Sequence, residues 1–207
     1  MKRHHLLIPF ALLWAGFVFQ TTVEPVASMG AASFVAPEDK ALVVFVRPSK
    51  RGKAISFFVF DESKKLLTLV KRKEHVAITL SPGKHTLYVV AENAGLVRAE
   101  LAAGRTYIIS MQPKMGLGKA GVVVEPVLRN SPSFAESAKW LRDTKLGNPD
   151  FNKGARWVRN HQDALDKRIS VAEWEWSSGD ATDRAAMTMG VNDGRTQEEA
   201  GSIVRRR

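Results

Sequence analysis

The sequence predicts a mainly β protein, an antiparallel β-sandwich of about seven to eight strands followed by a C-terminal α-helical extension. Between Ala41 and Val127, runs rich in Val, Ile, Phe and Tyr alternate with turn formers at intervals of roughly 8–12 residues. Two turns, Ser81-Pro82-Gly83 and Ala103-Gly104, come immediately before such runs. After Pro126 the apolar residues recur at helical spacing instead. The chain therefore changes from sheet to helix near this proline.

The sandwich domain is expected over residues 41–128, with one strand in each apolar run. We place strands at 41–47, 54–60, 65–70, 75–80, 84–91, 95–101, 105–112 and 120–127. A two-residue turn at Pro82-Gly83 would make a hairpin of 75–80 and 84–91, although Pro-Gly favours a type II turn and leaves a longer loop open. In that register, five apolar side chains share one face. They are Val76, Ile78, Leu80, Leu87 and Val89.

Residues 129–176 are expected to form a helical extension that packs on the sandwich. Ser133-Phe134-Ala135-Glu136 has the pattern of a capping box and predicts a short helix through about Leu141. Helical spacing then predicts one amphipathic helix from 152 to 176, with a break before Trp174 as an alternative. The four tryptophans of this region are expected to clamp the helices onto a sheet. They are Trp140, Trp157, Trp174 and Trp176.

Both ends of the chain lie outside these predicted domains. Residues 1–28 read as a signal peptide, with a cationic start, an apolar stretch from Leu6 to Phe19, and small residues up to Ser28. The apolar stretch is shorter than the roughly 20 residues that span a bilayer, so cleavage is favoured over an uncleaved anchor. Residues 29–40 are expected to be a linker. Residues 177–207, rich in Gly, Asp, Thr and charge, are expected to be a flexible tail with a basic end.

Composition and location together limit the partners. The formal net charge is +10 and there is no cysteine, which excludes a disulfide, a thiolate nucleophile and a lipid-bearing cysteine. A basic protein of the cytosol would suggest nucleic acid. For an exported, periplasmic protein we expect no nucleic acid, but an anionic envelope component (lipid headgroup, lipopolysaccharide or cell wall) or another envelope protein. The sequence gives no indication of the oligomeric state.

No motif indicates catalysis, a cofactor or a metal ion. Gly116-Leu117-Gly118-Lys119-Ala120-Gly121 matches a dinucleotide-binding pattern, but a strand follows where that motif needs a helix. The histidines beyond the signal peptide, His75, His85 and His161, lie too far apart in the predicted register to share a metal. No Ser-His-Asp arrangement is visible. We therefore expect no cofactor and no enzymatic activity, with a hydrolase as the least favoured class.

Basic residues gather in alternate loops of the predicted sandwich. Because successive strands reverse direction, the loops after the first, third, fifth and seventh strands emerge at the same end. Arg47 begins this set, and Glu74 and Glu92 are its acids. The candidate anion-binding residues are Lys50, Arg51, Lys53, Lys71, Arg72, Lys73, Lys114 and Lys119. The alternative is that these are the ordinary solvated lysines and arginines of a basic protein.

Several short stretches also indicate a family. They are Val43-Val44-Phe45-Val46-Arg47-Pro48, Pro82-Gly83-Lys84-His85, Ala91-Glu92-Asn93, Leu101-Ala102-Ala103-Gly104-Arg105-Thr106-Tyr107 and Pro113-Lys114-Met115-Gly116. Together they resemble a domain of unknown function found in small bacterial envelope proteins and lipoproteins. That family has Gly-Lys-Thr-Tyr-Tyr where this chain has Gly-Arg-Thr-Tyr-Ile at 104–108. The resemblance implies a sandwich of transthyretin or carboxypeptidase-regulatory type in the cell envelope, and it implies no catalytic residues.

From these observations we expect an exported, non-enzymatic envelope protein with an accessory or binding role, in which the basic loop end faces an anion. The alternative is a glycan- or peptide-binding module that uses aromatic side chains of the C-terminal helices.

Overall fold

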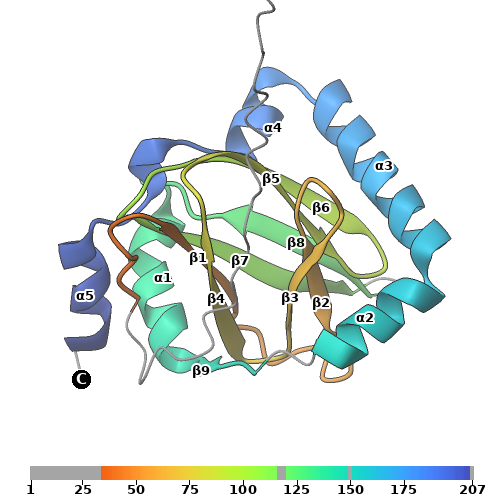
Figure 1. Ribbon diagram of the computed structural model, residues 1–207, viewed down its shortest axis with the longest axis horizontal. Coiled ribbons are helices and arrows are strands. Elements are labelled where there is room, and N and C mark those ends of the chain that lie inside the picture. The colour runs from red at the N-terminus through yellow and green to blue at the C-terminus, as the bar shows by residue number, and fades with distance from the viewer. Residues whose placement is uncertain (1–33, 116–119, 149–150, 206–207) are drawn as a thin grey trace, which may run out of the picture.

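Two five-stranded sheets pack face to face in the computed structural model, which describes residues 34–115, 120–148 and 151–205 (Figure 1). The strands are β1 (Ala41–Arg47), β2 (Phe57–Phe60), β3 (Leu66–Val70), β4 (Glu74–Leu80), β5 (Gly83–Val90), β6 (Ala94–Leu101), β7 (Thr106–Met115), β8 (Ala120–Pro126), β9 (Lys145–Leu146) and β10 (Thr188–Met189). The helices are α1 (Pro132–Asp143), α2 (Phe151–Asn160), α3 (Gln162–Ser178), α4 (Ala181–Ala186) and α5 (Gln197–Arg205), with a 3₁₀ turn η1 (Val191–Asp193).

The sheets are mixed, whereas the sequence predicts an antiparallel sandwich. One sheet has the order β8-β7-β1-β4-β9 and the other β10-β6-β5-β2-β3. The pairs β1–β7, β4–β9 and β6–β10 are parallel, and the remaining pairs are antiparallel. Strands β1 and β7 run in the same direction because successive strands reverse, and both are odd-numbered. The mainly β class is confirmed, and the purely antiparallel arrangement is not.

The predicted hairpin of β4 and β5 is wrong, although its grouping of side chains is right. Strand β4 pairs with β1, and β5 pairs with β2 and β6, so the two strands belong to different sheets. The turn at Ser81-Pro82 carries the chain from one sheet to the other. The five apolar residues expected on one face nevertheless all lie in the core between the sheets. The alternation of apolar and polar residues along β4 and β5 therefore identifies the side chains that face the core, but it does not show which strands pair with each other.

Each sheet also buries its outer face, which gives the molecule four layers. Leu42, Val44 and Val46 on the outer face of β1 pack in a cluster with Leu141 and Ile203, from α1 and α5. The other outer face holds a cluster of residues from β2, β5 and β6 with Leu165, Ile169 and Ala172 of α3. Every residue of β1 is buried as a result. The near-continuous apolar composition of β1 follows from burial on both faces.

The helices begin and end at other residues than the sequence predicts. Helix α1 starts at Pro132 with Ser131 as N-cap and no side-chain cap bond, so Ser133 does not form the expected capping box. A proline in the first turn suits this start because its missing N–H has no helical partner there. The expected single helix at 152–176 is two helices separated at His161. The break lets α2 cross β3 while α3 runs along β6.

The C-terminal segment expected to be flexible packs on both sheets. Strand β10 extends one sheet along β6, and Arg195 bridges to Thr106 of the other. Three apolar residues of the segment, Met189, Ala200 and Ile203, are buried and anchor it, whereas Val191 is exposed. Part of the predicted linker is packed as well, with the Phe34 carbonyl accepting a bond from the Thr106 hydroxyl. None of the helices among the described residues is long and apolar enough to cross a membrane.

Candidate anion-binding surface

The loops at one end of the sandwich carry the predicted basic residues. Arg47 at the end of β1 lies opposite Glu74 at the start of β4, and Phe57 at the start of β2 lies opposite Val70 at the end of β3. The loops 48–56 and 71–73 therefore emerge together, and the Arg72 guanidinium donates a hydrogen bond to the Lys50 carbonyl at 3.3 Å. We call these two loops, together with Lys145, the basic end.

Arg47 is not one of the surface cations, contrary to the sequence interpretation. Its side chain is fully buried, with the guanidinium 4.3 Å from the centre of the Phe57 ring. It donates hydrogen bonds to the carbonyls of Ile55 at 2.6 Å, Gly52 at 2.8 Å and Arg51 at 3.0 Å. Burial is the main cause that lowers its pKa to about 10. Arg47 therefore holds the loop 48–56 in place from beneath.

The loop above this guanidinium depends on a glycine. Gly52 has φ +66°, and a Cβ there would lie 2.7 Å from Ile55 Cδ1 and 3.0 Å from Arg47 Nη2. A larger residue would be strained in this backbone conformation and would press on the buried side chain. The cations before and after Gly52 are exposed as a consequence of this turn: Lys50, Arg51 and Lys53.

The other predicted cations differ in position. Lys71, Arg72 and Lys73 are half-buried at the second loop. Lys114 is exposed, but it lies beside Asn93 and Trp176 in a separate hollow under α3 and α4. Lys119 lies outside the described residues. The structure thus brings together six of the eight predicted residues.

Lys145 belongs to the basic end and was missed by sequence reasoning. Its backbone N–H donates to the Lys73 carbonyl at 3.1 Å, because β9 adds to the edge of the sheet beside β4. Its side chain is 76% exposed. Lys145 follows the end of α1 and is more than seventy positions from Lys73 in the sequence, so only the short β9 pairing places the two together. No local pattern in the sequence signals a two-residue strand.

The acids near the basic end are engaged by partners of their own. A Glu74 carboxylate oxygen accepts a bond from the Lys71 backbone N–H, and the other lies 3.9 Å from Lys145 Nζ. Glu92 pairs with Arg168 of α3 at 3.3 Å. None of the four ion pairs among the described residues includes Lys50, Arg51 or Lys53. The exposed cations of loop 48–56 are therefore left with their charge facing outward.

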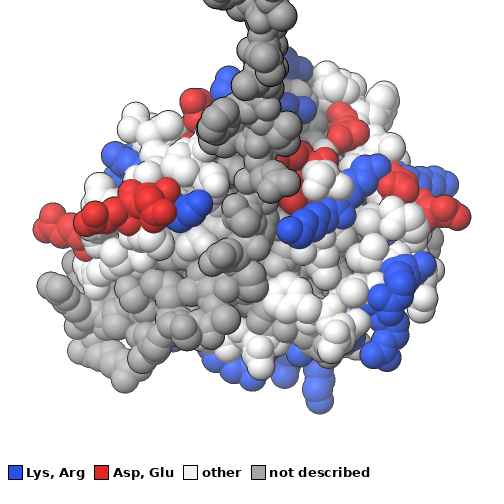
Figure 2. Space-filling model, viewed as in Figure 1, with Lys and Arg blue, Asp and Glu red and all other residues white. Residues whose placement is uncertain are grey.

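The charges on the surface are unevenly distributed. Figure 2 shows blue side chains along the lower edge and the lower right of the molecule, where Figure 1 has β9, α2 and the lower loops. Red side chains form a group at the left of the same view and smaller groups at its top and right, above this edge. On this face, the lower edge therefore carries mainly cations, whereas cations and acids are mixed above it.

The tryptophans of the helices act mainly in packing. Trp157 stacks on Phe58, with ring centres 4.3 Å apart, and on its other face with His161, at 4.9 Å. Both faces of this indole are therefore covered, although its edge lines a groove of about 340 Å³ beside Ala54. Trp176 lies 4.2 Å from the Arg98 guanidinium. Trp174, 68% exposed, is the exception to the predicted clamping role. This arrangement leaves Trp157 no open face on which a sugar could stack.

The histidines are separated and make structural contacts. His75 is buried, its Nδ1 is 2.9 Å from the Thr144 hydroxyl, and its ring meets that of Phe34 edge-on. Burial lowers the pKa of His75 to about 4. His85 Nε2 contacts the Ser81 carbonyl at 2.8 Å. Within the described ranges, no three His, Asp or Glu side chains are grouped so as to hold a metal ion.

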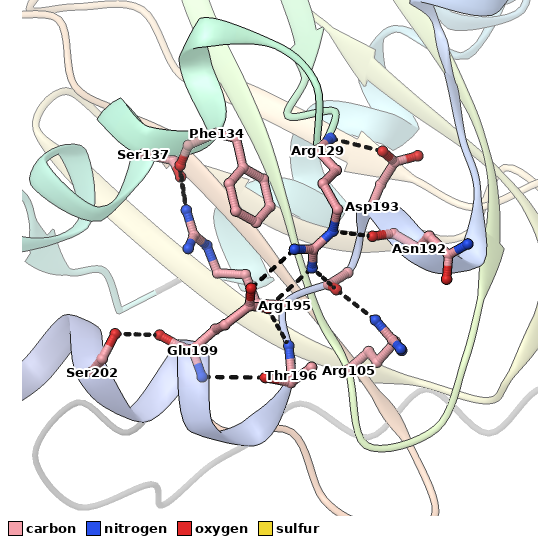
Figure 3. A network of polar contacts seen from close by, with 11 residues as sticks. Arg105, Arg129, Phe134, Ser137, Asn192, Asp193, Arg195, Thr196, Glu199 and Ser202 are labelled. Atoms are coloured by element: carbon pink, nitrogen blue, oxygen red, sulfur yellow. Dashed lines mark hydrogen bonds and ion pairs between the residues drawn. The ribbon is translucent and has the colours of Figure 1, made fainter.

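A second arginine cluster joins the C-terminal segment to α1 (Figure 3), and we call it the C-terminal clamp: Arg105, Arg129, Phe134, Arg195 and Glu199. Arg129 binds both carboxylate oxygens of Glu199, at 2.9 and 3.0 Å, and the carbonyls of Asn192 and Gly194. Arg195 donates to the Phe134 carbonyl and the Ser137 hydroxyl. Figure 3 shows the Phe134 ring between the two guanidinium groups, whose centres are 4.7 and 4.0 Å from it.

The charges of the clamp are used within the protein. Hydrogen bonding from Arg129 is the main cause that lowers the pKa of Glu199 to about 2. Burial lowers the pKa of Arg195. Since carboxylate, carbonyl and ring partners surround these guanidinium groups, the clamp is a structural junction.

A scan against models of protein families, a search of curated proteins and a search of solved structures each find no match. The family resemblance of the sandwich stretch therefore stays a prediction.

Proposed function

We propose that this chain is a non-catalytic protein of the bacterial cell envelope that binds an anionic surface through its basic end. The observation that carries the proposal is the exposed triplet Lys50, Arg51 and Lys53, held on a loop by the buried Arg47 and unmatched by acids among the described residues. The signal-like N-terminus and the resemblance to envelope proteins support the location.

The expected strength of such binding is modest. A lysine or arginine held near an acidic membrane contributes about 1 kcal/mol. A flat surface cannot touch both loops and Lys145 equally, so only some of the cations contribute fully. Exposed charges are screened over a Debye length of about 8 Å at physiological salt. Binding is therefore expected at low salt and is expected to weaken steeply as salt is added.

The test is charge reversal with a matched control. The triple substitution Lys50→Glu, Arg51→Glu and Lys53→Glu removes the exposed triplet. Lys65→Glu, Lys84→Glu and Lys139→Glu changes the net charge equally at exposed positions elsewhere. Sedimentation is measured with vesicles of equal parts phosphatidylglycerol and phosphatidylcholine, and binding to soluble polyglutamate is measured in parallel.

The basic-end variant should lose both kinds of binding at low salt, while the control variant retains most of each. Equal losses in the two variants would mean that only net charge matters. A wild-type protein that binds neither probe would overturn the proposal.

A further inference from the structure

We infer that the anionic surface is a lipid bilayer, and that Leu146 and Phe151 enter it between the cations of the basic end. This inference rests on the proposed function and adds to it the class of partner. It is based on the position of two exposed apolar side chains that do not belong to any of the hydrophobic clusters that the described residues form.

Leu146 lies at the basic end by direct backbone pairing. It forms β9 with Lys145 and pairs with His75 of β4, just after the loop 71–73. The neighbouring N–H groups of Lys145 and Gly147 donate to the carbonyls of Lys73 and His75 at 3.1 and 2.8 Å. This pairing holds Leu146 on the edge of the sheet, where it is 56% exposed.

Phe151 begins helix α2, and the start of this helix lies at the same lower edge as β9 in Figure 1. Phe151 is 39% exposed, although a phenylalanine so placed would be expected to pack against the nearby sheet. Further along the helix, Gly154 lies against Leu66 of β3, so the start of α2 is fixed by packing. Figure 1 shows β9, the start of α2 and the lower loops along one edge.

Exposed apolar side chains at the same end of the molecule as a group of cations fit a bilayer better than a purely hydrophilic polyanion. Lysine and arginine attract anionic headgroups, while leucine and phenylalanine gain by leaving water for the boundary of the acyl chains. A soluble polyanion or a cell-wall polymer offers the charge but no apolar phase. Trp174 of α3 is also exposed, but the residues on either side of it in the sequence are Glu173 and Glu175. Val171, exposed one turn earlier, lines a hollow of mixed charge with Lys167, Arg168 and Glu175.

Single-cysteine probes test the inference directly, because the chain has no cysteine of its own. Leu146→Cys and Phe151→Cys, each carrying an environment-sensitive fluorophore, should show a blue shift and a rise in emission when the phosphatidylglycerol vesicles are added. The same fluorophore at Trp174→Cys should remain in water. Unchanged emission at residues 146 and 151 in protein that sediments with vesicles would overturn the inference.

A binding experiment separates this inference from the proposed function. Leu146→Gln with Phe151→Gln should weaken vesicle binding about tenfold or more, since each side chain loses its transfer from water. The same variant should bind polyglutamate like the wild type. The control, Val171→Gln with Trp174→Gln, should bind both probes normally. If the wild type binds polyglutamate but not vesicles, or if the double variant binds vesicles normally, the bilayer inference fails while the proposed function stands.

Discussion

Two arginine clusters in this protein use the same side chain in opposite ways. In the C-terminal clamp, Arg129 pairs with the Glu199 carboxylate, and Arg195 is enclosed by α1 and the Phe134 ring. At the basic end, Arg47 is buried against carbonyl groups and the Phe57 ring, with no carboxylate of the described residues bound to it, and the loop it supports turns three further cations outward. The comparison teaches that charge satisfied internally builds structure, whereas charge left outward is available to a partner.

Acid is expected to have the largest effect, and it acts on the stability of the whole fold through a buried histidine. The pKa of buried His75 is about 4, below the ordinary 6.5, so the unfolded chain binds the proton more readily. Stability is therefore full above pH 6.5 and should fall by about 3 kcal/mol as the pH approaches 4. Denaturant unfolding across this range of pH provides the measurement.

The assignment to His75 has its own control. His75→Leu should flatten the pH dependence, and His161→Leu, at an exposed histidine, should leave it as in the wild type. An acid slope that is identical in both variants would show that another group is responsible.

Removing the Arg195 guanidinium from the clamp should lower the stability of the fold without changing vesicle binding. Arg195→Met leaves the Phe134 carbonyl and the Ser137 hydroxyl without this donor and removes the contact with the Phe134 ring. We expect a loss of about 2 kcal/mol in the free energy of unfolding. Vesicle binding by the folded variant should not change. If Arg195→Met keeps wild-type stability but binds vesicles more weakly, the clamp itself takes part in binding, contrary to this account.

The same substitution at the basic end should affect both properties. Arg47→Met removes three hydrogen bonds to the loop 48–56 but also removes a buried charge, so the loss of stability should be smaller, about 1–2 kcal/mol. The loosened loop should bind anionic vesicles more weakly, because its cations must be ordered on binding. Thermal melting and vesicle sedimentation of the two Arg→Met variants, measured side by side, make the comparison. If Arg47→Met binds anionic vesicles with the affinity of the wild type, Arg47 does not prepare the loop 48–56 for binding.

The smallest effect is expected at the ion pair of the clamp. Glu199→Gln keeps the shape of the side chain but removes the charge that Arg129 binds. Because both side chains are about one-third exposed, the loss should be about 1 kcal/mol and should shrink in high salt. Denaturant melts at two salt concentrations measure it. A loss that does not depend on salt would point to packing rather than charge.

The sequence predicts well what depends on local pattern. Turn formers and apolar runs place the eight long strands, and the alternation in β4 and β5 identifies core side chains such as Ile78 and Leu87. Successive reversal of the strands also places Lys50 and Arg72 at one end. These features follow from rules that act within one strand and its flanking turns.

The sequence does not predict what depends on distant pairing. Three features of this kind join segments that are far apart in the chain. They are the parallel pairing of β1 with β7, the position of Lys145 beside Lys73 and the bridge from Arg195 to Thr106. Arg47 looks like a loop cation until the carbonyls around it are known. The polar composition after Ser177 suggests mobility, but its few apolar side chains are enough to anchor it.

The central claim is that the basic end, and not the clamp, meets the anionic surface. Amide chemical shifts of the isotope-labelled protein, recorded as nanodiscs containing phosphatidylglycerol are added, test it residue by residue. The account predicts changes concentrated at residues 48–56, 71–73, 145–146 and 151, with none at 192–199. Changes centred on 192–199, or spread evenly over the surface, would contradict it.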